Sequence, residues 1–240
     1  MVVTSLRALL QFTTILPLGE PADFASFARR SWLYPVAGWV TGGLVAIAVF
    51  WIPERAVAAA VAISLLLLLS GANHFDGLLD LGDGLMAHGD PERRIQAMTD
   101  RQTGAGGIAI AVAVLILTYA GLQSASFLAW PLLVGEVGAA FSMAFLTAYG
   151  NPVREGIHSF LHSYARPAFP LYAVVLCVPL VLIPVSRSGL AVAAVATVVT
   201  PIIVLFVARR LFGGVNGDVV GGCHEITRAV IIAALVLMAA

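Results

Sequence analysis

The residues most able to carry chemistry are three aspartates in the stretch 73–84. Asp76, Asp80 and Asp83 come directly after an apolar run that is too long for an ordinary core helix. On a helix, residues four and seven positions apart project from one face, here within a stripe roughly 60° wide. Neighbouring carboxylates repel one another unless a cation lies among them. The stripe therefore predicts a site for a hard divalent ion such as Mg²⁺, which prefers carboxylate oxygens and often bridges to substrate phosphates.

A second polar segment, 86–107, follows the stripe. Pro91 is placed to begin a short helix, and a glycine cluster ends the segment. Between them lie a fourth carboxylate and several cationic side chains, and the candidate residues are Arg93, Arg94, Asp100, Arg101 and Gly104. The arginines predict a clamp for a diphosphate, and glycines allow backbone to approach a phosphate. An alternative stays open: the glycines only let two helices pack, and the arginines only set the membrane topology.

A third segment, 213–225, is rich in glycine and contains two acids and a histidine. We expect a cytoplasmic loop here, with Asn216 and Asp218 placed to close over a substrate. A flexible turn between two membrane spans explains the same composition equally well.

Two further side chains stand out. Glu136 lies inside an apolar segment, where a charge costs about 2.5–3.5 kcal/mol on insertion scales, so we expect it to face the bundle interior and to be paired or protonated. Such a residue serves either a proton relay or a structural hydrogen bond. His74, beside the stripe, is a candidate general base, and a helix-end histidine that bonds a carboxylate or orients a ligand is the alternative.

The composition predicts a polytopic membrane protein. Of 240 residues, 60% are hydrophobic and 11% charged, far from the average of soluble domains. The 13 basic residues balance 13 acidic ones, which favours no nucleic-acid partner. Apolar windows long enough to approach or cross a bilayer lie near 32–52, 56–75, 105–122, 127–148, 169–185 and 189–208, with a shorter one at 227–240. We expect an all-α membrane bundle of about seven segments, forming one domain over 1–240.

The basic residues are distributed unevenly between the two sides. All are arginines, and only Arg55 and Arg187 fall on one side, whereas the others, Arg228 among them, fall on the opposite side. The positive-inside rule assigns the arginine-rich side to the cytoplasm. The aspartate stripe lies on that side, so we expect a multi-pass protein of the cell membrane, surrounded by lipid, with its site facing the cytoplasm.

Several separated motifs resemble one family. The stretches His74–Gly84 and Glu92–Asp100 with Gly104 are similar to those of cobalamin 5'-phosphate synthases, also called adenosylcobinamide-GDP ribazoletransferases. Four shorter motifs agree in order along nearly the whole chain: Phe12–Pro17, Tyr34–Gly38, Arg154–Gly156 and Gly213–Asp218.

This resemblance implies a membrane enzyme of the last assembly stage of vitamin B12. It would join adenosylcobinamide-GDP to α-ribazole or α-ribazole 5'-phosphate, release GMP and require Mg²⁺. Asp100 or His74 would accept the hydroxyl proton, and a homo-oligomer stays possible. The implied metal ligands are Asp76, Asp80, Asp83 and Asp100. The implied substrate-binding residues are Asn73, Arg93, Arg94, Arg101, Gly104, Arg154, Asn216 and Asp218.

The chain departs from that family pattern at two places. Many members have Asp-Ser-Arg where this chain has Asp100-Arg101-Gln102, and many have an arginine in the fourth span where this chain has Glu136. The arginine is thus moved by one position and the serine is absent, whereas the four aspartates are intact.

Two other classes fit less well. A CDP-alcohol phosphotransferase motif matches Asp80, Asp83, Gly84 and Ala87, but then fails at His88, Ala97, Arg101 and Ala105. A secondary transporter predicts acids near the bilayer midplane and an internal repeat, whereas here the acids lie at one edge and no repeat is found.

Overall fold

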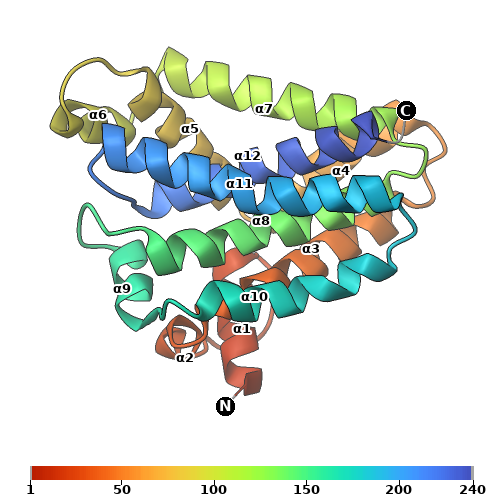
Figure 1. Ribbon diagram of the computed structural model, residues 1–240, viewed down its shortest axis with the longest axis horizontal. Coiled ribbons are helices and arrows are strands. Elements are labelled where there is room, and N and C mark those ends of the chain that lie inside the picture. The colour runs from red at the N-terminus through yellow and green to blue at the C-terminus, as the bar shows by residue number, and fades with distance from the viewer. Residues whose placement is uncertain (1, 239–240) are drawn as a thin grey trace.

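The computed structural model describes residues 2–238 and is almost entirely helical (Figure 1). No β-strand occurs in that part of the chain, which confirms the all-α prediction. Its helices, with two 3₁₀ helices labelled η, are α1 Val2–Thr13, α2 Phe24–Ala28, η1 Ser31–Leu33, α3 Tyr34–Val49, α4 Arg55–Leu69, α5 Asn73–Met86, α6 Pro91–Met98, α7 Ala105–Ser124, α8 Ala129–Tyr149, α9 Ile157–Tyr164, α10 Phe169–Cys177, η2 Val178–Leu182, α11 Arg187–Leu211 and α12 Gly217–Leu237.

Five helices are long and apolar enough to cross a membrane: η1 with α3, then α7, α8, α11 and α12. Two further pairs meet the same criteria only together, and each pair is sharply bent, α4 with α5 by 93° and α9 with α10 and η2 by 95°. Counting each bent pair as one span gives up to seven. The predicted polytopic bundle of about seven segments is therefore confirmed.

The predicted span 56–75 is wrong at its end, because α4 stops at Leu69 and the chain turns before α5. Gly71 and Ala72 have φ of +60° and +57°, in the left-handed region that breaks a helix. The bend turns the aspartates of α5 away from the α4 axis. The predicted span 169–185 likewise divides into α10 and the 3₁₀ helix η2.

The predicted loop 213–225 and the predicted short span 227–240 are also wrong, because α12 begins at Gly217 and continues to Leu237. Residues 239 and 240 of that predicted span lie outside the described part. Asn216 caps the helix, since its side-chain oxygen accepts a hydrogen bond from the Val219 N–H. Gly221 and Gly222 lie inside α12 and allow it to touch α5: a methyl group added at Gly221 would lie 3.2 Å from the His74 Cα.

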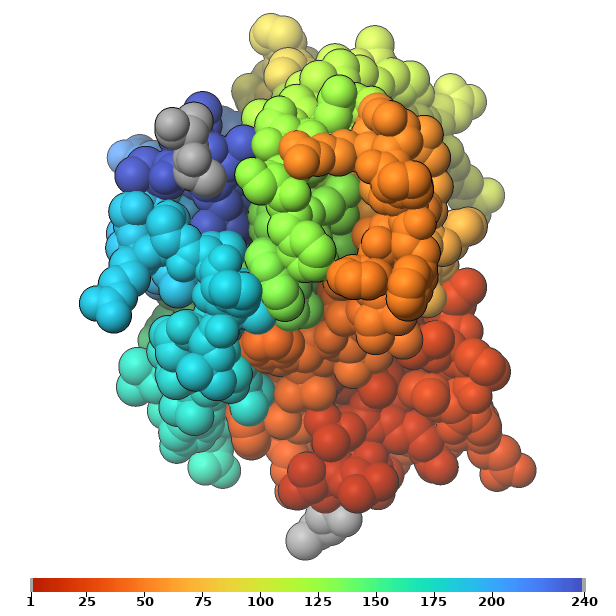
Figure 2. All heavy atoms as spheres, turned by 90° about the vertical axis from the view of Figure 1, so that its right-hand side faces the viewer, coloured from red at the N-terminus to blue at the C-terminus, as the bar shows by residue number. Residues whose placement is uncertain are grey.

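Helix α8 runs through the middle of the bundle, and α3, α11 and α12 pack around it (Figure 1). In its apolar 18-residue stretch, 78% of the residues are buried. Helices α6 and α9 lie at one end of the bundle, on the left in Figure 1. The turns that join α3 to α4, α7 to α8 and η2 to α11 gather at the opposite end, which faces the viewer in Figure 2.

Candidate active site

The three aspartates of the stripe lie together on α5, as their spacing predicts. A fourth carboxylate joins them from another helix, because Asp218 lies in the first turn of α12. Gly77 permits this approach, since a methyl group there would lie 2.9 Å from the Asp218 carbonyl oxygen. Two helices remote in sequence thus build one acidic cluster, which we define as Asp76, Asp80, Asp83 and Asp218.

The acidic cluster carries more negative charge than its surroundings neutralise. Asp80 is partly buried, and the charges of Asp218, Asp76 and Asp83 act on it together with that of Arg154. An added cation reduces the repulsion among these carboxylates.

Arg154 forms an ion pair with this cluster. Its guanidinium lies 3.4 Å from the Asp218 carboxylate, and the Asn216 side-chain amide donates to the same carboxylate at 2.6 Å. Backbone pairing holds the two loops in place: the Val215 N–H donates to the Asn151 carbonyl, and the Val153 N–H donates to the Val215 carbonyl. The predicted substrate residues Arg154, Asn216 and Asp218 are therefore brought together on fixed backbone rather than on a flexible loop.

Asp83 binds backbone as well as belonging to the cluster. Its two carboxylate oxygens accept hydrogen bonds from the N–H groups of Gly104 and Gly107, each at 2.7 Å. Asp83 thereby caps the start of α7 from a different helix. The Gly104 N–H is thus bonded to this carboxylate, and the approach of Gly104 to a substrate phosphate stays a prediction.

Four more predicted site residues lie in the segment between α5 and α7: Arg93, Arg94, Asp100 and Arg101. Asp100 is exposed, and one of its oxygens accepts a hydrogen bond from the Gln102 N–H. Arg94 donates to the carbonyls of Gly84 and Leu85 and so covers the last turn of α5. Arg93 and Arg101 are exposed. Asp100 is thus placed on the segment beside Asp83 but outside the acidic cluster.

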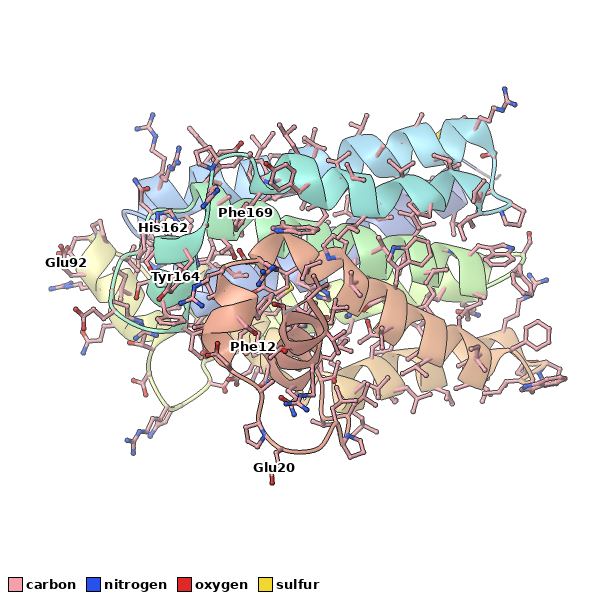
Figure 3. The ribbon with its side chains drawn as sticks, turned by 90° about the horizontal axis from the view of Figure 1, so that it is seen from below. Phe12, Glu20, Glu92, His162, Tyr164 and Phe169 are labelled. Atoms are coloured by element: carbon pink, nitrogen blue, oxygen red, sulfur yellow. The ribbon has the colours of Figure 1, made fainter. Side chains whose placement is uncertain are left out.

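A cleft of about 320 Å³ opens beside the cluster. Its wall contains Asn73, His74 and Asp76 from α5 and Asp218 from α12, with His158 from α9 opposite. Figure 3 shows α9, with His162 and Tyr164, and α6, with Glu92, at the same end of the bundle. The predicted residues Asn73 and His74 therefore share a cleft with two carboxylates of the cluster.

His74 also lines a small pocket, where its ring lies 4.3 Å from that of His224. Glu136 and Arg228 line the same pocket, with their charged atoms 3.0 Å apart and exposures of 3% and 2%. Glu136 also accepts a hydrogen bond from the Thr41 hydroxyl at 2.9 Å, and Arg228 also pairs with Glu225. The prediction of a paired, inward-facing Glu136 is confirmed. The placement of Arg228 among the cytoplasmic arginines is wrong, because it is buried in the bundle.

Sequence reasoning did not find this buried network. A signal exists, since Glu225 and Arg228 are three residues apart and share a face once the segment is helical. Treating 213–225 as a loop concealed that periodicity.

Comparison with known proteins agrees with these features. The family model described as cobalamin-5-phosphate synthase matches residues 5–236. Proteins named adenosylcobinamide-GDP ribazoletransferase are similar over most of their length: 36% identity in Halorubrum lacusprofundi, covering 95% of both chains, and 35% in Deinococcus radiodurans, covering 90% of this chain and 80% of the relative. The relative from Methanococcoides burtonii is 30% identical, covering 96% of this chain and 91% of its own. No solved structure matches. With this coverage, the chain belongs to the cobalamin-5-phosphate synthase family of enzymes.

Proposed function

We propose that the protein is a Mg²⁺-dependent phosphotransferase of the cell membrane that joins adenosylcobinamide-GDP to α-ribazole or α-ribazole 5'-phosphate and releases GMP. The observation that carries this proposal is the acidic cluster with Arg154, which lies beside an open cleft in a chain matched by the family over nearly its whole length. The names of the curated relatives supply the substrates.

The acidic cluster fits Mg²⁺ by its donor chemistry. Carboxylate oxygens are the ligands that this ion prefers. Among the described residues, no three of the cluster carboxylates place oxygens within 4.8 Å of one another. One or two of Asp76, Asp80 and Asp218 would therefore bind Mg²⁺ directly, and the others would bind it through its waters. Asp83 is partly committed to α7. When bound, Mg²⁺ supplies Lewis-acid stabilisation of charge on the diphosphate.

The chain's own residues bind and orient the substrates. Arg154 is about half exposed and its pair with Asp218 is long, so its guanidinium is available to a diphosphate that enters the cleft. Asn216 holds the Asp218 carboxylate in position. Arg93 and Arg101 are exposed at the same end and are free to meet the leaving nucleotide. A ribazole hydroxyl then attacks the cobinamide-side phosphorus and GMP departs.

Asp100 or His74 would accept the proton from that hydroxyl. Asp100 lies on the segment that Gly104 fastens to Asp83, and His74 lines the cleft. The excess of arginines at the end that holds α6 and α9 supports a cytoplasmic site.

GMP release by the purified protein in nanodiscs tests this proposal. The complete mixture contains adenosylcobinamide-GDP, α-ribazole 5'-phosphate and Mg²⁺, and each is omitted in turn. A parallel mixture supplies free α-ribazole, and another supplies a CDP-alcohol with a lipid acceptor.

GMP that appears only with a ribazole acceptor and Mg²⁺ supports the proposal, and the ratio of the two ribazole rates identifies the preferred acceptor. CMP release from the CDP-alcohol without GMP release would assign a different substrate. GMP release that persists in the presence of a chelator would show that the reaction does not require Mg²⁺.

A further inference from the structure

We propose that His74, His224 and Glu225 form a second metal site, separate from the acidic cluster, for a transition-metal ion of the Zn²⁺ class. Among the described residues, these three supply the group of histidine and carboxylate donor atoms that lie within 4.8 Å of one another. Two imidazoles with one carboxylate are a ligand set typical of Zn²⁺, whereas Mg²⁺ prefers oxygen alone.

The buried Nδ1 atom of His224 is the first independent observation. This side chain is 4% exposed, and Nδ1 makes no hydrogen bond of good geometry, although it lies 3.4 Å from the Glu225 Oε1 atom. An unsatisfied polar atom in a bundle interior costs about 1–3 kcal/mol. A metal ion bonded to that nitrogen removes this cost.

The spacing of the donor atoms is the second observation. The His224 Nδ1 atom lies 3.4 Å from the Glu225 Oε1 atom. Two ligand atoms about 2.1 Å from a tetrahedral Zn²⁺ lie about 3.4 Å apart. The other carboxylate oxygen, Oε2, faces Arg228, so Oε1 is the one turned toward the histidines.

The charge of the pocket also favours a cation. With neutral histidines, Glu136 and Glu225 contribute two negative charges, and Arg228 contributes one positive charge. The buried surplus of one negative charge is unfavourable in a low-dielectric interior. A bound cation supplies the missing positive charge.

The surroundings leave space for one more ligand. The three side chains line a small pocket of about 20 Å³, which is room for a single water molecule. Two imidazoles, one carboxylate and one water complete four-coordinate geometry. The ion would join the first turn of α5 to α12 directly behind the cleft, and His74 would be a metal ligand rather than a base.

Metal binding by the full-length protein in detergent tests this site without any turnover. The protein is stripped with a chelator and titrated with Zn²⁺ in excess Mg²⁺, which occupies oxygen-only sites. Bound metal is then measured by mass spectrometry. We expect one Zn²⁺ per chain, with His224→Gln binding at least ~100-fold more weakly. The matched control is His88→Gln, which removes an exposed histidine of the 87–90 turn and should bind as the wild type does.

X-ray absorption of the Zn²⁺-loaded wild type gives a second readout that does not depend on any variant folding. Two imidazole ligands at about 2.0–2.1 Å support the site. An oxygen-only shell, no Zn²⁺ binding by the wild type, or equal affinity in a folded His224→Gln protein would overturn it. These outcomes are independent of GMP release, so the proposed reaction and this site succeed or fail separately.

Discussion

The carboxylate of Glu136 on α8 lies 3.0 Å from the guanidinium of Arg228 on α12, and both side chains are buried. This pair joins two helices that are adjacent in the bundle core but 92 residues apart in sequence. Removing one partner of a buried pair leaves an uncompensated charge, which typically costs 3–5 kcal/mol.

A charge exchange tests this pair. Glu136→Arg turns the net charge of the pocket from −1 to +1, and Arg228→Glu turns it to −3, because Glu225 remains in both. We expect each single variant to lose several kcal/mol of stability, at least ~3. The double variant restores the net charge of −1 and should unfold at a temperature closer to that of the wild type. Thermal unfolding in detergent measures the cycle. A double variant no more stable than the weaker single variant contradicts a direct pairing.

Asp80→Asn separates activity from stability. The variant lacks one of four neighbouring carboxylates and therefore part of their mutual repulsion. Metal-free Asp80→Asn should unfold at a temperature equal to or higher than that of metal-free wild type, measured by thermal unfolding in detergent. GMP release by the variant should fall at least ~100-fold. Normal turnover by the variant would show that Asp80 is not part of the active site.

Asp83→Asn should behave differently from Asp80→Asn. An asparagine can offer only one oxygen to the two N–H donors of Gly104 and Gly107, so one donor loses its acceptor. We expect a loss of about 1–3 kcal/mol in stability as well as reduced turnover. Hydrogen exchange of the first turn of α7 should increase in this variant and stay unchanged in Asp80→Asn, which is the matched control.

Arg154→Gln should weaken substrate binding and leave the fold intact. The arginine is about half exposed, and such ion pairs contribute about 0–1 kcal/mol to stability. A charge-assisted contact to phosphate contributes more, so we expect KM for adenosylcobinamide-GDP to rise about 10-fold. The control is Arg166→Gln, which changes an exposed arginine in the turn between α9 and α10. Equal kinetics in the two variants would mean that Arg154 does not meet the substrate.

Gly107→Ala should separate α5 from α7. An added methyl group would overlap the Leu79 carbonyl oxygen and lie 2.9 Å from an oxygen of Asp83. Overpacking of this kind costs about 1–3 kcal/mol, so the unfolding temperature and the turnover should both fall. Gly43→Ala is the matched control, because no atom lies within 4 Å of its added methyl group. A stable, active Gly107→Ala protein would show that this contact is loose.

The helical character of the chain and the chemistry of its acidic stripe could be predicted from the sequence. Long apolar windows predict membrane spans, and the spacing of Asp76, Asp80 and Asp83 predicts that they share one helix face. Both predictions depend only on local helical geometry. Pro91 at the start of α6 and the inward pairing of Glu136 were predictable for the same local reasons.

Only the tertiary structure decided which distant residues complete the site. The turn at Gly71 and Ala72, the helical state of 217–225 and the burial of Arg228 depend on α5 packing against α12, where glycines replace side chains that would hold the helices apart. That contact brings Asp218 to the stripe and His224 to His74. No local pattern specifies such pairings, because a helix contact between residues more than a hundred positions apart is set by the complementary shape of two surfaces.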